Sequence, residues 1–130
     1  MLRISYARDE GSPELAFAGE YSLEQVERAF AAVLGGSDEE CGKGLIVDTT
    51  ESETEFTHEE LRGLAEFLAR RRERLGHRMA LLVSSDGALH YGTARVLSSY
   101  AEPEGLVVGV FTSMDEARRW ISPEWQGGKS

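Results

Sequence analysis

The residues best suited to chemistry in this 130-residue chain are two acids and a histidine. Asp48 and Asp86 each follow an apolar run, and His90 stands four residues after Asp86. Carboxylates beside an imidazole can support acid–base chemistry, so hydrolysis is conceivable. However, no nucleophile stands at a recognisable spacing from His90, and the chain has no G-x-S-x-G, H-E-x-x-H, Walker or dinucleotide-binding motif. We therefore predict that the protein is not an enzyme, with an uncharacterised hydrolase as an alternative.

Thr57 offers a hydroxyl at the expected start of a helix. The run Thr57-His58-Glu59-Glu60 has the spacing of a capping box, in which a threonine and an acid three residues later bond to each other's backbone. A phosphate on Thr57 would gain from the helix dipole, but it would face Glu55, Glu59 and Glu60. We expect a structural cap. Phosphorylation of Thr57, and contact of Thr57 and His58 with a partner, are the alternatives.

Acidic residues dominate the stretch from residue 48 to residue 60. It contains no Lys or Arg and six acids, namely Asp48, Glu51, Glu53, Glu55, Glu59 and Glu60. Anionic ligands should avoid such a stretch. We interpret it as a solvated loop, with a docking patch for a basic partner as the alternative. The spacing does not match an EF-hand and no histidine pair accompanies it, so we predict no metal and no other cofactor.

Arg95 lies near the start of a later predicted helix, where a cation is locally unfavourable. An acid at the strand ends should therefore compensate it, and Asp48 or Asp86 is the expected partner. The alternative is that Arg95 anchors an anion or ligand.

Three residues before Arg95 complete the opening of this helix. We expect His90 and Tyr91 to pack at the edge of the core, with ligand contact as the alternative for each. Gly92 is expected to let the helix pack closely on a sheet.

Composition bounds the class of protein. The chain has 14 Lys and Arg against 23 Asp and Glu, a formal net charge of −9, which argues against nucleic acid as a partner. The single cysteine, Cys41, cannot form an internal disulfide and suits a reducing compartment. No stretch approaches the roughly 20 apolar residues of a membrane span, and no signal-like run opens the chain. We expect a cytoplasmic protein without integral membrane association.

Hydrophobic periodicity predicts the order ββαβαβαβα. Strands are expected at residues 2–7, 14–19, 44–48, 79–83 and 106–111, and helices are expected to begin at the caps Ser22, Thr57, Asp86 and Ser113. Alternating strands and helices require parallel neighbours with right-handed crossovers. The prediction is an α/β fold whose five-stranded sheet is mostly parallel, with an antiparallel N-terminal edge strand. Function would then lie outside the carboxyl ends of the strands.

Several segments resemble one bacterial family. The most specific are residues 91–95 (Tyr-Gly-Thr-Ala-Arg) and residues 108–121, which begin Val-Gly-Val-Phe-Thr and end Glu-Ala-Arg-Arg-Trp-Ile; residues 45–49 and 78–83 add to them. Together they resemble the SpoIIAA-like proteins, also called STAS/SEC14 domain proteins. The resemblance covers roughly residues 1–122, predicted to be one domain, and residues 123–130 are expected to form a flexible polar tail.

The resemblance implies a β-α superhelix with helices mostly on one face, shared with anti-sigma-factor antagonists and lipid-binding SEC14 domains. Anti-sigma-factor antagonists carry an Asp-Ser-Ser-Gly-like stretch, with a phosphorylatable serine, at the start of the helix after the central strand. Residues 55–60 of this chain read Glu-Phe-Thr-His-Glu-Glu instead, so Thr57 alone offers a hydroxyl there. This departure puts the phospho-switch in doubt.

We therefore predict a non-catalytic regulatory or protein-binding module of the SpoIIAA-like/STAS type. It should act through a strand-end rim without a pocket, and the candidate contact residues are Asp48, Thr57, His58, Asp86, His90, Tyr91 and Arg95. A carrier of a small apolar or lipid-like ligand is the first alternative. A homodimer is also plausible, because helices on one face leave the other sheet face uncovered.

Overall fold

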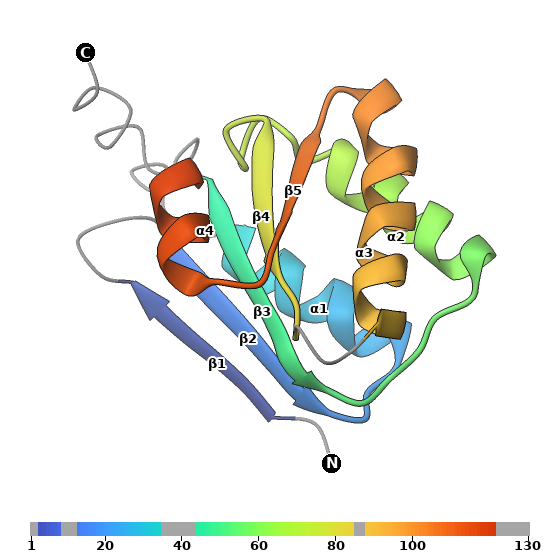
Figure 1. Ribbon diagram of the computed structural model, residues 1–130. Coiled ribbons are helices and arrows are strands. Elements are labelled where there is room, and N and C mark those ends of the chain that lie inside the picture. The colour runs from blue at the N-terminus through green and yellow to red at the C-terminus, as the bar shows by residue number, and fades with distance from the viewer. Residues whose placement is uncertain (1–2, 9–12, 35–43, 85–87, 122–130) are drawn as a thin grey trace.

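The computed structural model describes residues 3–8, 13–34, 44–84 and 88–121. Within these residues, five strands form one sheet whose order follows the chain (Figure 1). The strands are β1 Arg3–Arg8, β2 Pro13–Gly19, β3 Leu45–Ser52, β4 Arg78–Leu82 and β5 Val107–Phe111. The helices are α1 Leu23–Leu34, α2 His58–Ala69, α3 Ala88–Ala101 and α4 Met114–Ile121, with a 3-10 turn, η2, at Glu102–Glu104. The expected tail at residues 123–130 lies outside the described residues.

Strands β2 to β5 run parallel. Met79 of β4 pairs with Leu45 of β3 on one side and with Val108 of β5 on the other. β1 pairs antiparallel with β2, with Arg3 opposite Ala18. The predicted α/β fold with parallel neighbours is confirmed, and the carboxyl ends of β2 to β5 meet at one edge of the sheet, called here the carboxyl edge.

The sheet is covered unequally on its two faces. Helices α1, α2 and α3 cover one face, where alternate strand residues such as Phe17, Val47 and Met79 are buried in the main core (Figure 1). On the other face α4 packs across β3, β4 and β5, and buries Ile46 against Ile121. Because successive strand residues point to opposite faces, each strand contributes to both layers.

The predicted helix caps are formed wherever the structure describes them. The Ser22 N–H donates to Gln25 Oε1 at 2.9 Å, and the Gln25 N–H donates to Ser22 Oγ at 3.2 Å. At α4 the Glu116 N–H donates to Ser113 Oγ at 3.4 Å. Asp86, the cap expected for α3, lies outside the described residues.

Three local expectations were wrong. The second helix ends at Ala69 and not at Gly76, because the chain turns after Arg70. β3 continues to Ser52, where a loop was expected. Gly92 is exposed, and a Cβ there would meet nothing within 4 Å, so it does not permit close packing on the sheet. Among the described residues, no helix has the length and apolar character needed to cross a membrane.

Candidate functional site

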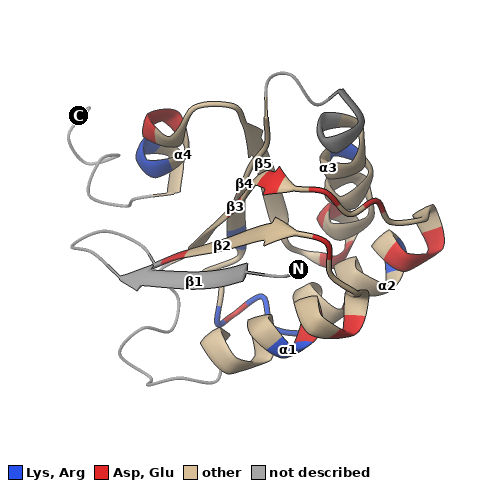
Figure 2. Ribbon diagram, turned by 90° about the horizontal axis from the view of Figure 1, so that it is seen from below, with Lys and Arg blue, Asp and Glu red and all other residues tan. Residues whose placement is uncertain are grey.

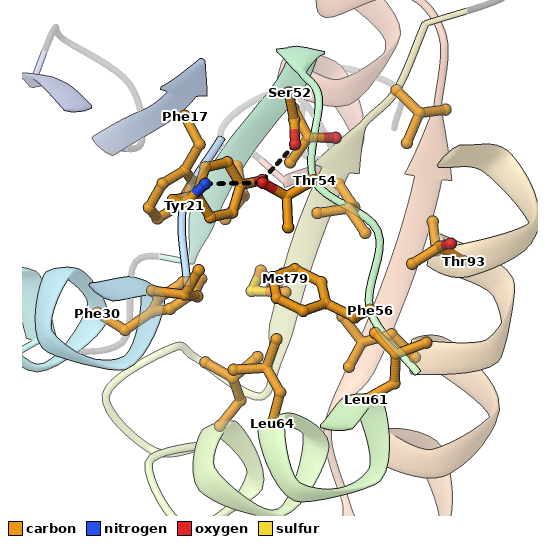
Figure 3. A pocket seen from close by; sticks show the side chains of 18 residues that line it. Phe17, Tyr21, Phe30, Ser52, Thr54, Phe56, Leu61, Leu64, Met79 and Thr93 are labelled. Atoms are coloured by element: carbon orange, nitrogen blue, oxygen red, sulfur yellow. Dashed lines mark hydrogen bonds between the residues drawn. The ribbon is translucent and has the colours of Figure 1, made fainter. Parts of the chain in front are cut away.

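An apolar pocket of about 70 Å³ lies between the helix-covered face of the sheet and helices α1, α2 and α3 (Figure 3). Buried side chains form its floor, among them Phe30 from α1, Leu64 from α2 and Met79 from β4. Its partly exposed lining residues gather near the carboxyl edge and are Tyr21, Thr49, Thr54, Phe56 and Thr93. The pocket therefore opens near that edge, and the expectation of a rim without a pocket was wrong.

An irregularity in β3 determines which residues face the pocket. Ala16 of β2 pairs with Asp48, but Ala18 pairs with Glu51, so β3 has one extra residue between these two pairs. Such a bulge shifts the alternation of side chains along the strand. Thr49 faces the pocket before the bulge, and Ser52 faces it afterwards.

Residues 52–56, called here the pocket wall, continue this alternation. Ser52, Thr54 and Phe56 line the pocket, whereas Glu53 and Glu55 between them are exposed. Sequence reasoning missed this wall because it treated the acids as a loop. The signal was present as a strict alternation of acids with Ser, Thr and Phe, which is the pattern of a half-buried extended segment.

The polar groups of the pocket wall hold the wall in place. Ser52, 5% exposed, has its Oγ joined by a hydrogen bond to Tyr21 Oη (Figure 3). The Tyr21 N–H donates to Thr54 Oγ1 at 2.7 Å, and Thr49 Oγ1 donates to the Leu82 carbonyl at 2.9 Å. Because these groups already have partners, the surface left for a ligand is mainly apolar.

Burial raises the pKa of Tyr21 above its ordinary value of 10.0, and the hydrogen bond with Ser52 opposes this shift. The phenol is therefore neutral at physiological pH. It supports the wall as a neutral hydrogen-bonding group and is not a base.

The outer side of the pocket wall is acidic. Glu51, Glu53, Glu55 and Glu59 are all exposed, and no Lys or Arg occurs between residues 48 and 60. Figure 2 shows acidic segments along the connection from β3 to α2 and at the start of α2. The pocket therefore lies beside a region of negative potential.

Thr57 and His58 follow directly on the pocket wall. The Glu60 N–H donates to Thr57 Oγ1 at 3.1 Å, and the Thr57 N–H donates to Glu60 Oε1 at 2.9 Å, which confirms the predicted capping box. His58 is the exposed first residue of α2. Phosphorylation of Thr57 stays a prediction.

Asp48 lies on the face of the sheet that α4 covers, as its neighbour two residues earlier, Ile46, does. Its Oδ1 accepts hydrogen bonds from the Thr50 N–H at 2.9 Å and the Thr50 hydroxyl at 2.7 Å. Arg95 is exposed on α3, which covers the opposite face. The expected ion pair between Asp48 and Arg95 is therefore not formed, because the sheet separates them.

The remaining predicted contact residues belong to the start of α3. Asp86 lies outside the described residues, and so do the side chains of His90 and Tyr91, although their backbone is helical. Since α3 lies on the face opposite Asp48, the structure does not bring Asp48 together with this helix. Thr93, one turn further along α3, does line the pocket.

Solved structures of the same fold include two informative ones. A crystal structure of an anti-sigma factor antagonist from Mycobacterium paratuberculosis matches with a TM-score of 0.66 and 14% identity, over 93% of this chain and 94% of that chain. An uncharacterized protein with a SpoIIAA-like fold from Shewanella loihica PV-4 matches with a TM-score of 0.56 and 20% identity, over 92% of this chain and 93% of that chain. No protein-family model and no curated protein matches the chain. The chain thus has the SpoIIAA-like fold, as its sequence resemblance predicted.

Proposed function

We propose that the protein is a non-catalytic regulatory module that binds a protein partner at the carboxyl edge of its sheet. The observation that carries this proposal is the pocket, which is apolar inside and has an acidic outer wall. A structure of the same fold is named an anti-sigma factor antagonist, which supports a regulatory role.

The arrangement fits what protein interfaces require. Interfaces gain most of their affinity from a few buried apolar anchors, and surrounding polar or charged groups contribute specificity and a faster association rate. Here the pocket supplies a place for an anchor, and Glu53 and Glu55 supply the charged surroundings. The capping box at Thr57 holds the adjoining end of the wall to α2.

A carrier of a small apolar ligand is the second candidate, and the apolar lining of the pocket is the observation that favours it. Size and charge limit this candidate. An engineered cavity of about 150 Å³ holds one benzene molecule, about twice the volume found here. The acidic wall also repels carboxylate or phosphate head groups.

Affinity capture from cells of the source organism tests the proposal. The baits are the full chain, its Glu53→Lys/Glu55→Lys variant, and a matched Glu102→Lys/Glu104→Lys variant. All four glutamates are exposed, and the control pair precedes β5 and so lies at the opposite edge of the sheet. Both double variants change the net charge equally.

We expect one protein to be retained by the unchanged chain and by the control, to be lost with the 53/55 variant, and to bind again when both components are purified. Equal retention by all three baits would contradict the proposed site. Native mass spectrometry showing a bound small apolar molecule, with no protein partner captured, would overturn the proposal in favour of the carrier.

A further inference from the structure

The volume of the pocket limits what can enter it. A benzene ring of six carbons in about 150 Å³ corresponds to about 25 Å³ per carbon, so the pocket of about 70 Å³ takes about three carbons. That is the size of the end of one aliphatic side chain. A lipid chain is much longer than the pocket can hold.

The chemistry of the lining excludes a polar group at the bottom of the pocket. Its deepest lining residues are hydrocarbon or thioether side chains, including Leu68 and Met79, which have no exposed surface. The polar groups nearby, on Tyr21, Ser52 and Thr54, bond to one another. A polar ligand atom would have to lose its water without gaining a free partner, which is unfavourable.

The charge beside the pocket selects what surrounds the entering group. Glu53 and Glu55 alternate with Thr54 and Phe56 of the wall, so the carboxylates lie within one residue of the lining. Successive residues in an extended chain are about 3.3 Å apart, well inside the Debye length of about 8 Å at physiological salt. Positive charges flanking an inserted apolar group are therefore attracted, and anionic ones are repelled.

We infer that the pocket anchors one aliphatic side chain of a short basic peptide segment in the partner, whose Lys or Arg residues lie along Glu53 and Glu55. This inference rests on the proposed protein-binding function. The partner is thus identified by chemistry: a basic segment with a single Val-, Leu- or Met-sized anchor. Neither the resemblance nor the fold comparison specifies this chemistry.

Selection from a phage-displayed library of random peptides tests the inference. The immobilised full chain selects binders, and the Thr93→Leu variant removes binders that do not need the pocket. Thr93 lines the pocket from α3, so a leucine there occupies part of its volume. Ser99→Leu is the matched control, because Ser99 is exposed on the same helix.

The selected peptides are then synthesised and titrated against the full chain by calorimetry. We expect a net positive charge and one recurrent aliphatic residue. Replacing that residue by serine should weaken binding about tenfold or more, because a buried anchor dominates the affinity of such a contact. This peptide change keeps the test decisive even when Thr93→Leu fails to fold.

Charge variants complete the titration. Glu53→Lys/Glu55→Lys should weaken binding about tenfold and reduce its salt dependence, whereas Glu102→Lys/Glu104→Lys and Ser99→Leu should bind as the unchanged chain does. Selected peptides that are neutral or acidic, or an anchor-to-serine change without effect, would overturn the inference.

The two proposals fail in distinguishable ways. A captured protein that depends on Glu53 and Glu55, but whose binding segment has no aliphatic anchor, would leave the proposed function standing and overturn the peptide inference. If neither the captured proteins nor the selected peptides depend on these glutamates, both proposals are wrong. Binding of 1-octanol that displaces the selected peptide would show that the pocket is reached; octanol binding without displacement would contradict the anchor.

Discussion

Thr57 fixes the junction between the pocket wall and α2 through its two hydrogen bonds with Glu60. Losing the hydroxyl leaves an amide of the first helical turn without its acceptor. We expect Thr57→Ala to lower the free energy of unfolding by about 1 kcal/mol, and Thr57→Ser to retain most of the stability. Urea denaturation followed by circular dichroism measures both. Equal losses in the two variants would show that the hydroxyl is not the cause.

Tyr21 should make the protein less stable at alkaline pH. Because its folded-state pKa is raised above 10.0, the folded chain holds the phenol proton more tightly than the unfolded chain does. The stabilising contribution is therefore complete below pH 10 and is lost as pH rises through the folded-state pKa. Urea denaturation between pH 8 and pH 11 should show a decline that Tyr21→Phe reduces.

Ser52→Ala is the control for the tyrosine. It removes the hydrogen-bond partner but keeps the titrating phenol, so the alkaline decline should remain. An alkaline decline unchanged by Tyr21→Phe would contradict the assignment to Tyr21.

Two glycines of different elements should respond in opposite directions to alanine. Gly44, before β3, has φ +85°, and a Cβ there would lie 2.7 Å from Ile121 Cγ1 of α4. We expect Gly44→Ala to cost about 1–2 kcal/mol in left-handed strain, with a further loss from the clash. Gly92→Ala, in α3 with open space around it, should add about 0.5–1 kcal/mol. Thermal unfolding measures both, and destabilisation by Gly92→Ala would contradict its placement.

The elements differ in how well their sequences predict them. The caps at Ser22 and Thr57 are local patterns, since both partners lie within three residues, and the structure confirms them. β3 is different, because its course beyond Asp48 depends on pairing with β2. The bulge between the two strands turns Ser52 into the pocket and leaves its acidic neighbours exposed. An acidic composition indicates a loop, but tertiary pairing makes an extended wall of it.

The fold of the whole molecule was predictable because alternating strands and helices allow few topologies. The pocket was not, since it results from how three helices pack over one sheet face, and no short motif records such a gap. Its lining comes from positions as distant as Phe17 and Leu97. Likewise, the expected pairing of Arg95 with Asp48 ignored which face each side of β3 presents.

Hydrogen–deuterium exchange of the full chain, alone and with its purified partner, tests binding at the carboxyl edge most directly. We expect the partner to slow exchange in residues 52–60 and in the first turns of α3, and to leave α4 and β1 unchanged. Slower exchange confined to α4 or β1, with residues 52–60 unaffected, would contradict the proposed site.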